Sequence, residues 1–192
     1  LQKILVADGS SSFSSIGGVL FNASKDTIVR YPMGISAKSY TVPSSVKTIH
    51  PFAFSHVASL SSIDLGSVSS IGEDAFTNCT GLKSITVPQS VETIGYCAFG
   101  YDADLKAVEG FVVKGVKGSA AESYCTESDD ENNYVNNFTF KEADQNELQY
   151  NGLKESQSGY FKYAVVNGEA YITSCGSSVD KPEIPSEIDG HP

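Results

Sequence analysis

The chain has 192 residues, of which 40% are hydrophobic, so it can bury a core of its own. It carries 23 Asp and Glu against 13 Lys and Arg, and the resulting net charge of -10 disfavours nucleic acid as a partner, because phosphate backbones are repelled. No stretch approaches the roughly 20 apolar residues that span a bilayer, so we expect no membrane span in this fragment. With four cysteines the chain is not a disulfide scaffold.

Two short strands are predicted near the start of the chain. Val19–Phe21 and Thr27–Tyr31 are rich in β-branched and aromatic residues, and the turn-forming stretch 22–26 separates them. We interpret this segment as a hairpin-like variant repeat, or as a lead-in to the repeats that follow.

Three copies of a repeat follow, between Val42 and Val108, with steps of 22 and 23 residues. Five apolar positions recur in register. They are Val46, Val68 and Val91; Ile49, Ile71 and Ile94; Ala53, Ala75 and Ala98; Phe54, Phe76 and Phe99; and Leu60, Leu82 and Leu105. This period is too short for a paired-helix repeat and lies in the leucine-rich-repeat range of about 20 to 29 residues.

Each copy predicts one coil of a solenoid. Leu82-x-x-Ile85-x-Val87 is typical of a short strand whose alternate residues point inward, and Val91-x-x-Ile94 is a second inward-facing stretch. Ala98 and Phe99 are expected to form a loose helical turn that places the ring in the centre. Because one coil cannot close its own core, coils stack about 4.8 Å apart and equivalent residues form ladders. We predict a leucine-rich-repeat solenoid that is mainly β with short helical turns.

A cap is expected at the end of this array. Phe111–Val113 is predicted to be the last strand, and a helix is expected from Ser119, a candidate N-cap, to Thr126. Repeat arrays need a cap over their exposed end, so Tyr124 and Cys125 are expected to face the last coil. The first domain is therefore predicted to span residues 1–126.

The charge is concentrated after this helix. Eight acidic residues and only one basic residue, Lys141, lie between Glu122 and Leu148, so this segment carries -7 of the net charge of -10, and it also holds five asparagines. We predict an acidic, Asn-rich, solvated connector over residues 127–159.

A second array is predicted after the connector, in residues 160–192. Tyr160–Val166 and Glu169–Ser174 are strand-like, and Asn167-Gly168 between them indicates a β-hairpin. Ile184–Ile188 then repeats the pattern seen at Val42–Val46. The array would be truncated at Pro192, and we expect the chain to be a fragment of a longer, multi-array protein.

The repeats resemble a known family. The stretches VPSSVKTIHPFAF, SIGEDAFTNCTGLKSITVPQSVETIGYCAF and IPSEIDG are similar to the BspA-type leucine-rich repeats of bacterial surface proteins. His50-Pro51 departs from the family's Gly-containing pair, and Gly66 stands where neighbouring copies have Pro43 and Pro88. The resemblance implies the solenoid, a short helix at the end of the array, and a bacterial cell-surface or extracellular location.

No set of residues in the sequence indicates catalysis. There is no Gly-x-Ser-x-Gly, His-Glu-x-x-His or phosphate-binding glycine loop, and the histidines lack metal-ligand spacing, so we expect no metal, no cofactor and no catalytic residue. Cys79 and Cys97 are expected to be packed thiols, although a bridge between them is an alternative.

The outward face of the strands is the candidate binding surface. Its residues are small and polar: Ser39 and Thr41, then Ser62 and Asp64, then Ser84 and Thr86, then Ala107 and Glu109. The candidate ligand-binding residues are Ser62, Asp64, Ser84, Thr86 and Glu109. With acidic residues toward the later coils, this face is expected to favour a polar or basic partner.

Three functions fit the sequence. The resemblance implies a non-catalytic adhesion or interaction module that presents its stacked sheet to a host protein, matrix or polysaccharide. The alternatives are a structural spacer and an accessory domain of a larger secreted, enzymatic protein. The open edge of the second array could also pair edge to edge with another copy.

Overall fold

The computed structural model describes residues 1–129, 134–143, 154–155, 161–166 and 169–175. The chain forms two compact units, residues 1–143 and 144–192, which are described separately.

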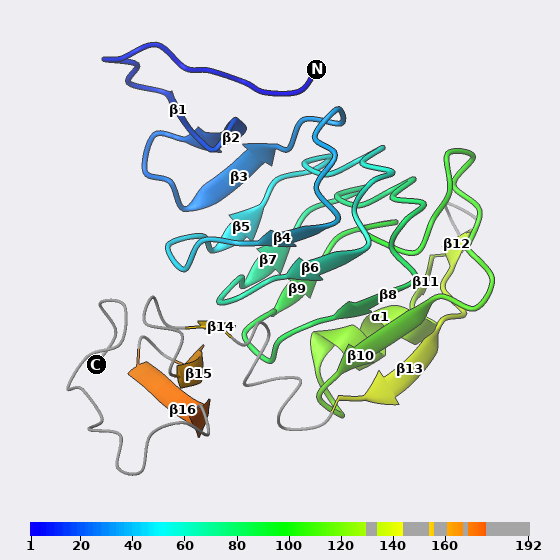
Figure 1. Cartoon of the computed structure of the whole chain (residues 1–192). Helices are drawn as coiled ribbons and strands as arrows, with labels where there is room; N and C mark the ends of the chain where they lie inside the picture. The colour runs from blue at the N-terminus through cyan, green and yellow to red at the C-terminus, as the bar shows by residue number, and fades with distance from the viewer. Residues whose placement is uncertain (130–133, 144–153, 156–160, 167–168, 176–192) are drawn as a thin grey trace. The chain divides into compact units, whose positions relative to one another are not determined.

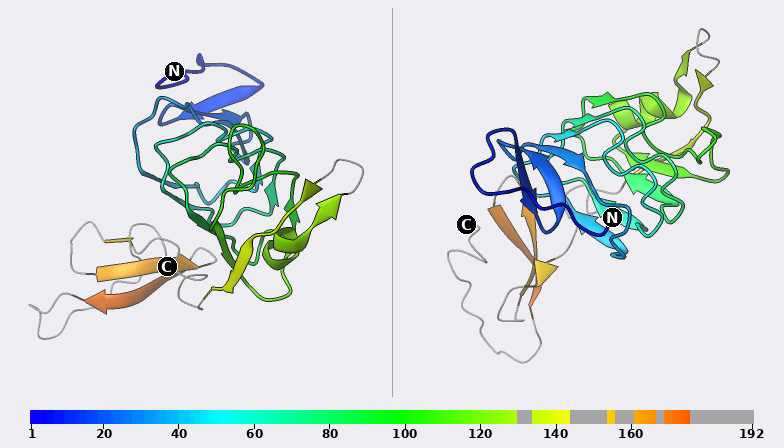
Figure 2. Two further views of the ribbon diagram at one scale, coloured as in Figure 1. Left: turned by 90° about the vertical axis from the view of Figure 1, so that its right-hand side faces the viewer. Right: turned by 90° about the horizontal axis from the view of Figure 1, so that it is seen from above.

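Two sets of short strands line the first unit (Figures 1 and 2). One sheet has the order β1-β2-β3-β5-β7-β9; its strands are β1 (Phe13–Ile16), β2 (Val19–Asn22), β3 (Thr27–Arg30), β5 (Thr48–Ile49), β7 (Ser70–Ile71) and β9 (Thr93–Ile94). The other set holds the pair β4-β6 and the ladder β8-β10-β13; its strands are β4 (Ser39–Thr41), β6 (Ser62–Asp64), β8 (Ser84–Thr86), β10 (Val112–Gly115) and β13 (Thr139–Glu142). The predicted solenoid is confirmed. The strands predicted at Val19–Phe21 and Thr27–Tyr31 are present as β2 and β3.

The repeated isoleucines stack in register along the first sheet. Ile28 pairs with Ile49, Ile49 with Ile71, and Ile71 with Ile94, all between parallel strands. β3 therefore occupies the place of a coil strand, while β1 and β2 continue the sheet as an antiparallel meander.

The aromatic column in the centre of the stack is also confirmed. The rings of Phe54 and Phe76 lie 4.9 Å apart and nearly parallel, and Tyr31 stacks on Phe54 at 5.0 Å. The same backbone hydrogen bond recurs from coil to coil, because the amides of Tyr31, Phe54 and Phe76 donate to the carbonyls of Ala53, Ala75 and Ala98 at 2.7–2.8 Å. Phe54, Phe76 and Phe99 are all fully buried.

The Ala-Phe segment is a tight turn, in which the amides of Ser55 and Val57 donate to the carbonyls of Phe52 and Phe54 at 3.1 Å. The residue two before each ring has a left-handed backbone: Phe52, Asp74 and Cys97 have φ of 61°, 52° and 47°. The left-handed residue lets the chain turn within one coil while the backbone amides of that coil still donate hydrogen bonds to the next coil. Gly72 shows how closely coils approach, since a Cβ there would clash with the Pro51 nitrogen.

The last coil departs from the others by an insertion. Nine positions separate Phe54 from Ile63 and Phe76 from Ile85, whereas fourteen separate Phe99 from Val113, the residue of β10 that pairs with Ile85. The extra five residues loop outward between Tyr101 and Ala107, which form an antiparallel bridge. Leu105 is therefore 45% exposed in a left-handed conformation and does not continue the column of Leu60 and Leu82.

The predicted capping helix is present as α1 (Ala120–Thr126), with Ser119 at its N-cap position. Tyr124 and Cys125 are buried, as predicted, and the Tyr124 ring lies 4.4 Å from that of Phe99. The Tyr124 hydroxyl donates to the Phe99 carbonyl at 2.9 Å and accepts from the Phe99 amide at 3.2 Å. One side chain thus replaces the backbone that a further coil would supply. The Ser119 hydroxyl makes no capping bond.

The predicted connector starts too early, because residues 134–143 belong to the first unit. β13 pairs in parallel with β10, and β11 (Ser128–Asp129) pairs with β12 (Tyr134–Val135). Phe138 is buried with its ring 5.8 Å from Phe111 and 6.0 Å from Tyr124. Asn136 is also buried, and its amide donates to the Tyr124 carbonyl at 2.6 Å. High charge in this segment coexists with an aromatic anchor that fixes it to the end of the stack.

The second unit contains the predicted hairpin. β15 (Phe161–Val166) pairs antiparallel with β16 (Glu169–Cys175), and β14 (Lys154–Glu155) adds a third strand on the other side of β15. The turn at Asn167-Gly168 and the segment Ile184–Ile188 lie outside the described residues. That this hairpin begins a second repeat array stays a prediction.

Candidate functional site

A stacked strand face is the regular exposed surface of the first unit. Figure 1 shows β4, β6, β8, β10 and β13 following one another along the stack. The central residue of each strand faces inward, and the flanking residues make two outward rows. The rows are Ser39, Ser62, Ser84, Val112 and Thr139, and Thr41, Asp64, Thr86, Lys114 and Lys141.

Four of the five predicted site residues lie on this face: Ser62 and Asp64 on β6, and Ser84 and Thr86 on β8. Asp64 also has a local structural role, because its carboxylate accepts the Gly66 amide at 2.9 Å and so stabilises the turn that follows the strand. Whether any of these residues binds a ligand stays a prediction.

The prediction that Glu109 belongs to this face is wrong. Ser84 pairs with Val112 and Thr86 with Lys114, so the positions expected for Ala107 and Glu109 are taken by residues five further along the chain. Glu109 lies exposed in the turn before β10. The cause is the insertion after Phe99, which shifts the register by its own length.

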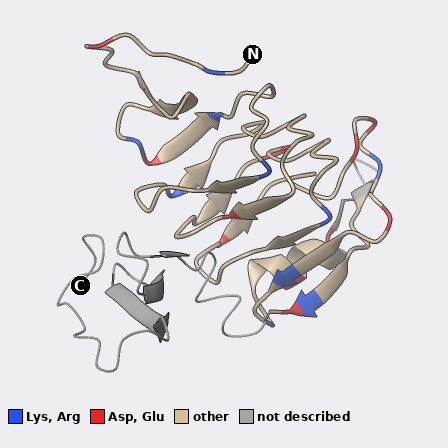
Figure 3. Ribbon diagram, viewed as in Figure 1, with Lys and Arg blue, Asp and Glu red and all other residues tan. Residues whose placement is uncertain are grey.

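This shift reverses the charge of the face at its C-terminal end. Lys114 on β10 and Lys141 on β13 are register partners, so two cations stand side by side where an acid was expected. Figure 3 shows basic residues on both of these strands. At this end of the row two lysines therefore replace the expected acid, and Glu142 follows Lys141 on β13. The signal for Lys141 was present in the sequence, since Phe138-Thr139-Phe140 is a strand-like run inside the acidic segment.

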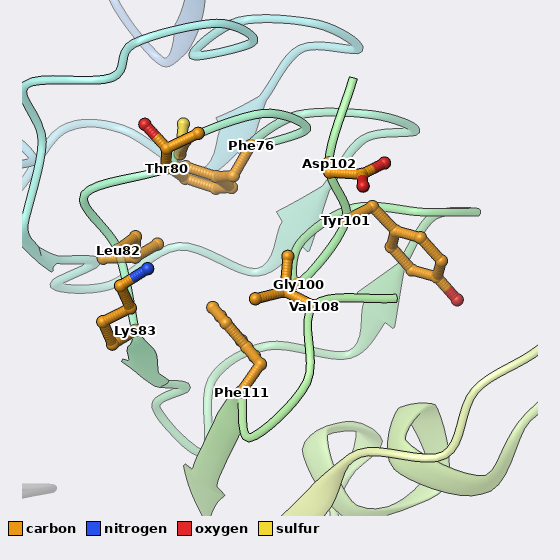
Figure 4. A pocket seen from close by; sticks show the side chains of 10 residues that line it. Phe76, Thr80, Leu82, Lys83, Gly100, Tyr101, Asp102, Val108 and Phe111 are labelled. Atoms are coloured by element: carbon orange, nitrogen blue, oxygen red, sulfur yellow. The ribbon is translucent and has the colours of Figure 1, made fainter. Parts of the chain in front are cut away.

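A small pocket lies beside the beginnings of β8 and β10 (Figure 4). Its volume is about 130 Å³. Its apolar wall includes Phe76, Leu82, Val108 and Phe111, and its polar residues are Thr80, Lys83, Tyr101 and Asp102. Lys83 and Asp102 stand on opposite sides of the opening in Figure 4. Sequence reasoning missed this pocket.

The pocket arises where the leucine column stops. Leu60 and Leu82 each stand three residues before an inward strand residue, and both are buried. The residue three before Val113 is Gly110, which has no side chain to cover Leu82 and whose φ of +74° suits glycine. The insertion then contributes Asp102 to the walls, and its flanking residues Tyr101 and Val108 contribute as well.

The cysteines of the first unit are structural. Cys79, Cys97 and Cys125 are buried free thiols, so the alternative of a bridge between Cys79 and Cys97 is wrong. Burial raises the pKa of the Cys79 thiol to about 12 and that of Cys97 and Cys125 to about 11. A thiol held protonated in this way is a poor nucleophile at neutral pH.

Within the described residues, no three His, Cys, Asp or Glu side chains come together in a way that could hold a metal ion. In the same part of the chain, no helix has both the length and the apolar character needed to cross a bilayer.

Comparison with known families agrees with the ladders. The model of the BspA type leucine rich repeat region matches residues 15–111 in six copies, which is just over half of the chain. The chain belongs to this family. The match includes β2 and β3, which makes the lead-in hairpin a variant repeat, and it ends at the residue before β10.

Solved structures similar to this BspA-type chain include two bacterial leucine-rich-repeat proteins. A leucine-rich repeat protein from Eubacterium ventriosum is 26% identical with a TM-score of 0.53, over 62% of this chain and 31% of that one. A leucine rich cell surface protein from Faecalibacterium prausnitzii is 17% identical with a TM-score of 0.46, over 72% of this chain and 41% of that one. The pneumococcal vaccine antigen PcpA is 16% identical with a TM-score of 0.33, over 74% of this chain and 50% of that one.

The chain spans half or less of the length of these structures. The comparison with curated proteins finds no match.

Proposed function

We propose that this chain is a non-catalytic protein-interaction module outside the bacterial cell, and that it binds an acidic partner through the basic end of its strand face. The observation that carries the proposal is the register of β8, β10 and β13, which places Lys114 beside Lys141 at the end of a flat row of small polar side chains. Membership of the BspA-type family and the similarity to the Eubacterium ventriosum protein support an interaction role.

The geometry of this face favours binding by a flat surface. The outward residues of β4, β6 and β8 are short and polar, so a partner can approach the backbone of these strands closely. Exposed ion pairs contribute little each, about 0.2–1 kcal/mol. The cations therefore select and orient the partner, while contact along the rows supplies area.

Charge reversal tests the proposal. The test variant carries both Lys114→Glu and Lys141→Glu. The control variant carries both Lys25→Glu and Lys47→Glu, so its net charge changes by the same amount at exposed positions away from this face. Poly-L-glutamate is the acidic protein-like probe, and polygalacturonate is the acidic polysaccharide probe. We expect the strand-face variant to bind poly-L-glutamate at least about 10-fold more weakly than the control variant, measured by surface plasmon resonance in 50 mM salt.

Equal weakening by both variants would contradict the proposal, because only overall charge would then matter. Binding of polygalacturonate without poly-L-glutamate would assign the face to a polysaccharide instead. A chain that serves only as a spacer predicts binding to neither probe.

A further inference from the structure

We propose that the pocket beside β8 and β10 receives one aromatic or leucine side chain from an acidic segment of a partner protein. The proposal rests on the proposed function, because it names the kind of partner that the strand face binds. It adds a specificity pocket that the rows of small polar side chains do not provide.

The size of the pocket limits what can enter it. An apolar cavity of about 150 Å³ is large enough to bind benzene, and this pocket measures about 130 Å³. It therefore fits a single phenyl ring or a leucine side chain, and it is too small for a folded segment or a sugar chain.

The chemistry of the walls favours an apolar occupant. The side chains of Phe76, Leu82 and Phe111 belong to the hydrophobic core and also line the pocket. A side chain that enters the pocket therefore contacts the core directly. Water in such a space finds few hydrogen-bond partners, and its replacement by an apolar group is favourable. The pocket lies over Leu82, at the place where a further regular coil would put its own leucine. A leucine or phenylalanine side chain of the partner therefore continues the column of Leu60 and Leu82.

The charges around the opening favour acidic residues beside that side chain. Lys83 is exposed and directly precedes β8, and Lys114 and Lys141 lie on the next two strands. Asp102 stands on the other side of the opening, where its carboxylate accepts the amides of Asp104 and Lys106 at 2.9 Å and is held in the turn of the insertion. The lysines are therefore the cations that an incoming chain meets on the strand side of the opening, and its acidic residues are favoured on that side.

Peptide probes test the occupant directly. The probe is acetyl-Glu-Glu-Phe-Glu-Glu-amide, compared with one peptide in which Ala replaces Phe and one in which Lys replaces each Glu. Binding is followed by NMR through the methyl resonances of Leu82 and Val108. We expect the Phe peptide to shift the methyl resonances of both residues. The Ala peptide should bind at least about 10-fold more weakly, because it loses the burial of a ring. The Lys peptide should also bind more weakly than the Phe peptide.

Two matched pairs of variants test the site. Thr80→Phe places a ring at the opening, and Ala58→Phe places the same ring at the equivalent exposed position of the preceding coil. Lys83→Ala removes the cation beside the opening, and Lys38→Ala removes the residue that precedes β4 in the same way. We expect Thr80→Phe to abolish binding of the Phe peptide and Lys83→Ala to weaken it about 3-fold or more, with both controls close to the parent chain.

The outcomes separate the two proposals. Equal binding of the Phe and Ala peptides, or equal effects of Thr80→Phe and Ala58→Phe, would overturn the pocket proposal. If that binding still depended on Lys114 and Lys141, the proposed function would survive without the pocket. Absence of binding by every peptide and by poly-L-glutamate would overturn both.

Discussion

The coil around Phe76 and the coil around Phe99 solve the same packing problem differently. In the first, nine positions separate the central ring from the inward strand residue, and Leu82 fills the column between them. In the second, the separation is fourteen, Leu105 is displaced to the surface, and Gly110 stands in the column. The regular coil contributes core and little else. The irregular coil contributes the pocket and the register that brings lysines to the strand face.

The largest effect is expected from the regular coil. Phe76→Ala removes a fully packed ring between neighbouring coils, and the free energy of unfolding should fall by about 3–5 kcal/mol, measured by urea denaturation followed by circular dichroism. The control is Phe52→Ala, since that ring is 50% exposed and its loss should cost less than about 1 kcal/mol. Similar losses from both variants would mean that the central column does not hold the stack together.

An intermediate effect is expected where the irregular coil meets its cap. Tyr124→Phe leaves the amide and carbonyl of Phe99 buried without the hydroxyl that bonds both, which should cost about 1–3 kcal/mol. Amide hydrogen exchange gives an internal control. Exchange at Phe99 should accelerate, while the Phe76 amide, which bonds to the Ala98 carbonyl, should remain protected by comparison. Unchanged exchange at Phe99 would show that the hydroxyl does not replace a coil.

The smallest effect is expected from removing the insertion. Deletion of residues 102–106 restores the nine-residue spacing, and the bridge between Tyr101 and Ala107 already holds the two ends together. We expect a change of at most about 1 kcal/mol in the free energy of unfolding, because surface loops tolerate changes of length well. The control is the deletion of residues 55–59 from the coil around Phe54, which has the same nine-residue spacing as the regular coil, and this deletion should prevent folding. Equal damage by both deletions would show that the last coil needs its insertion to form.

The repeat columns could be predicted because each coil meets the same environment. A residue that must bury its side chain against an identical neighbour recurs at a constant interval, so Ile49, Ile71 and Ile94 show the ladder directly. The helix and its buried Tyr124 follow from the same logic, since the end of a stack needs a cover. The prediction that Leu105 belongs to the leucine column was wrong. A leucine at the right sequence interval looks like a column residue until the path of the backbone is known.

The acidic segment shows a second limit of sequence reasoning. Its charge count predicted a solvated connector, yet Phe138 is buried and β13 extends the sheet. Net charge averages over a segment, whereas one aromatic residue can fix a strand if a complementary surface exists. That surface is made by Tyr101, Phe111 and Tyr124, which the sequence places far from Phe138 and only the fold brings to it.

By itself, the sequence determined the family, the period, the central aromatic column and the capping helix, because these depend on local patterns that repeat. Tertiary structure alone decided which residues share the strand face and where the pocket opens. Both depend on how many residues loop out between two strands, and that number becomes visible only when Val112 and Lys114 are found paired with Ser84 and Thr86.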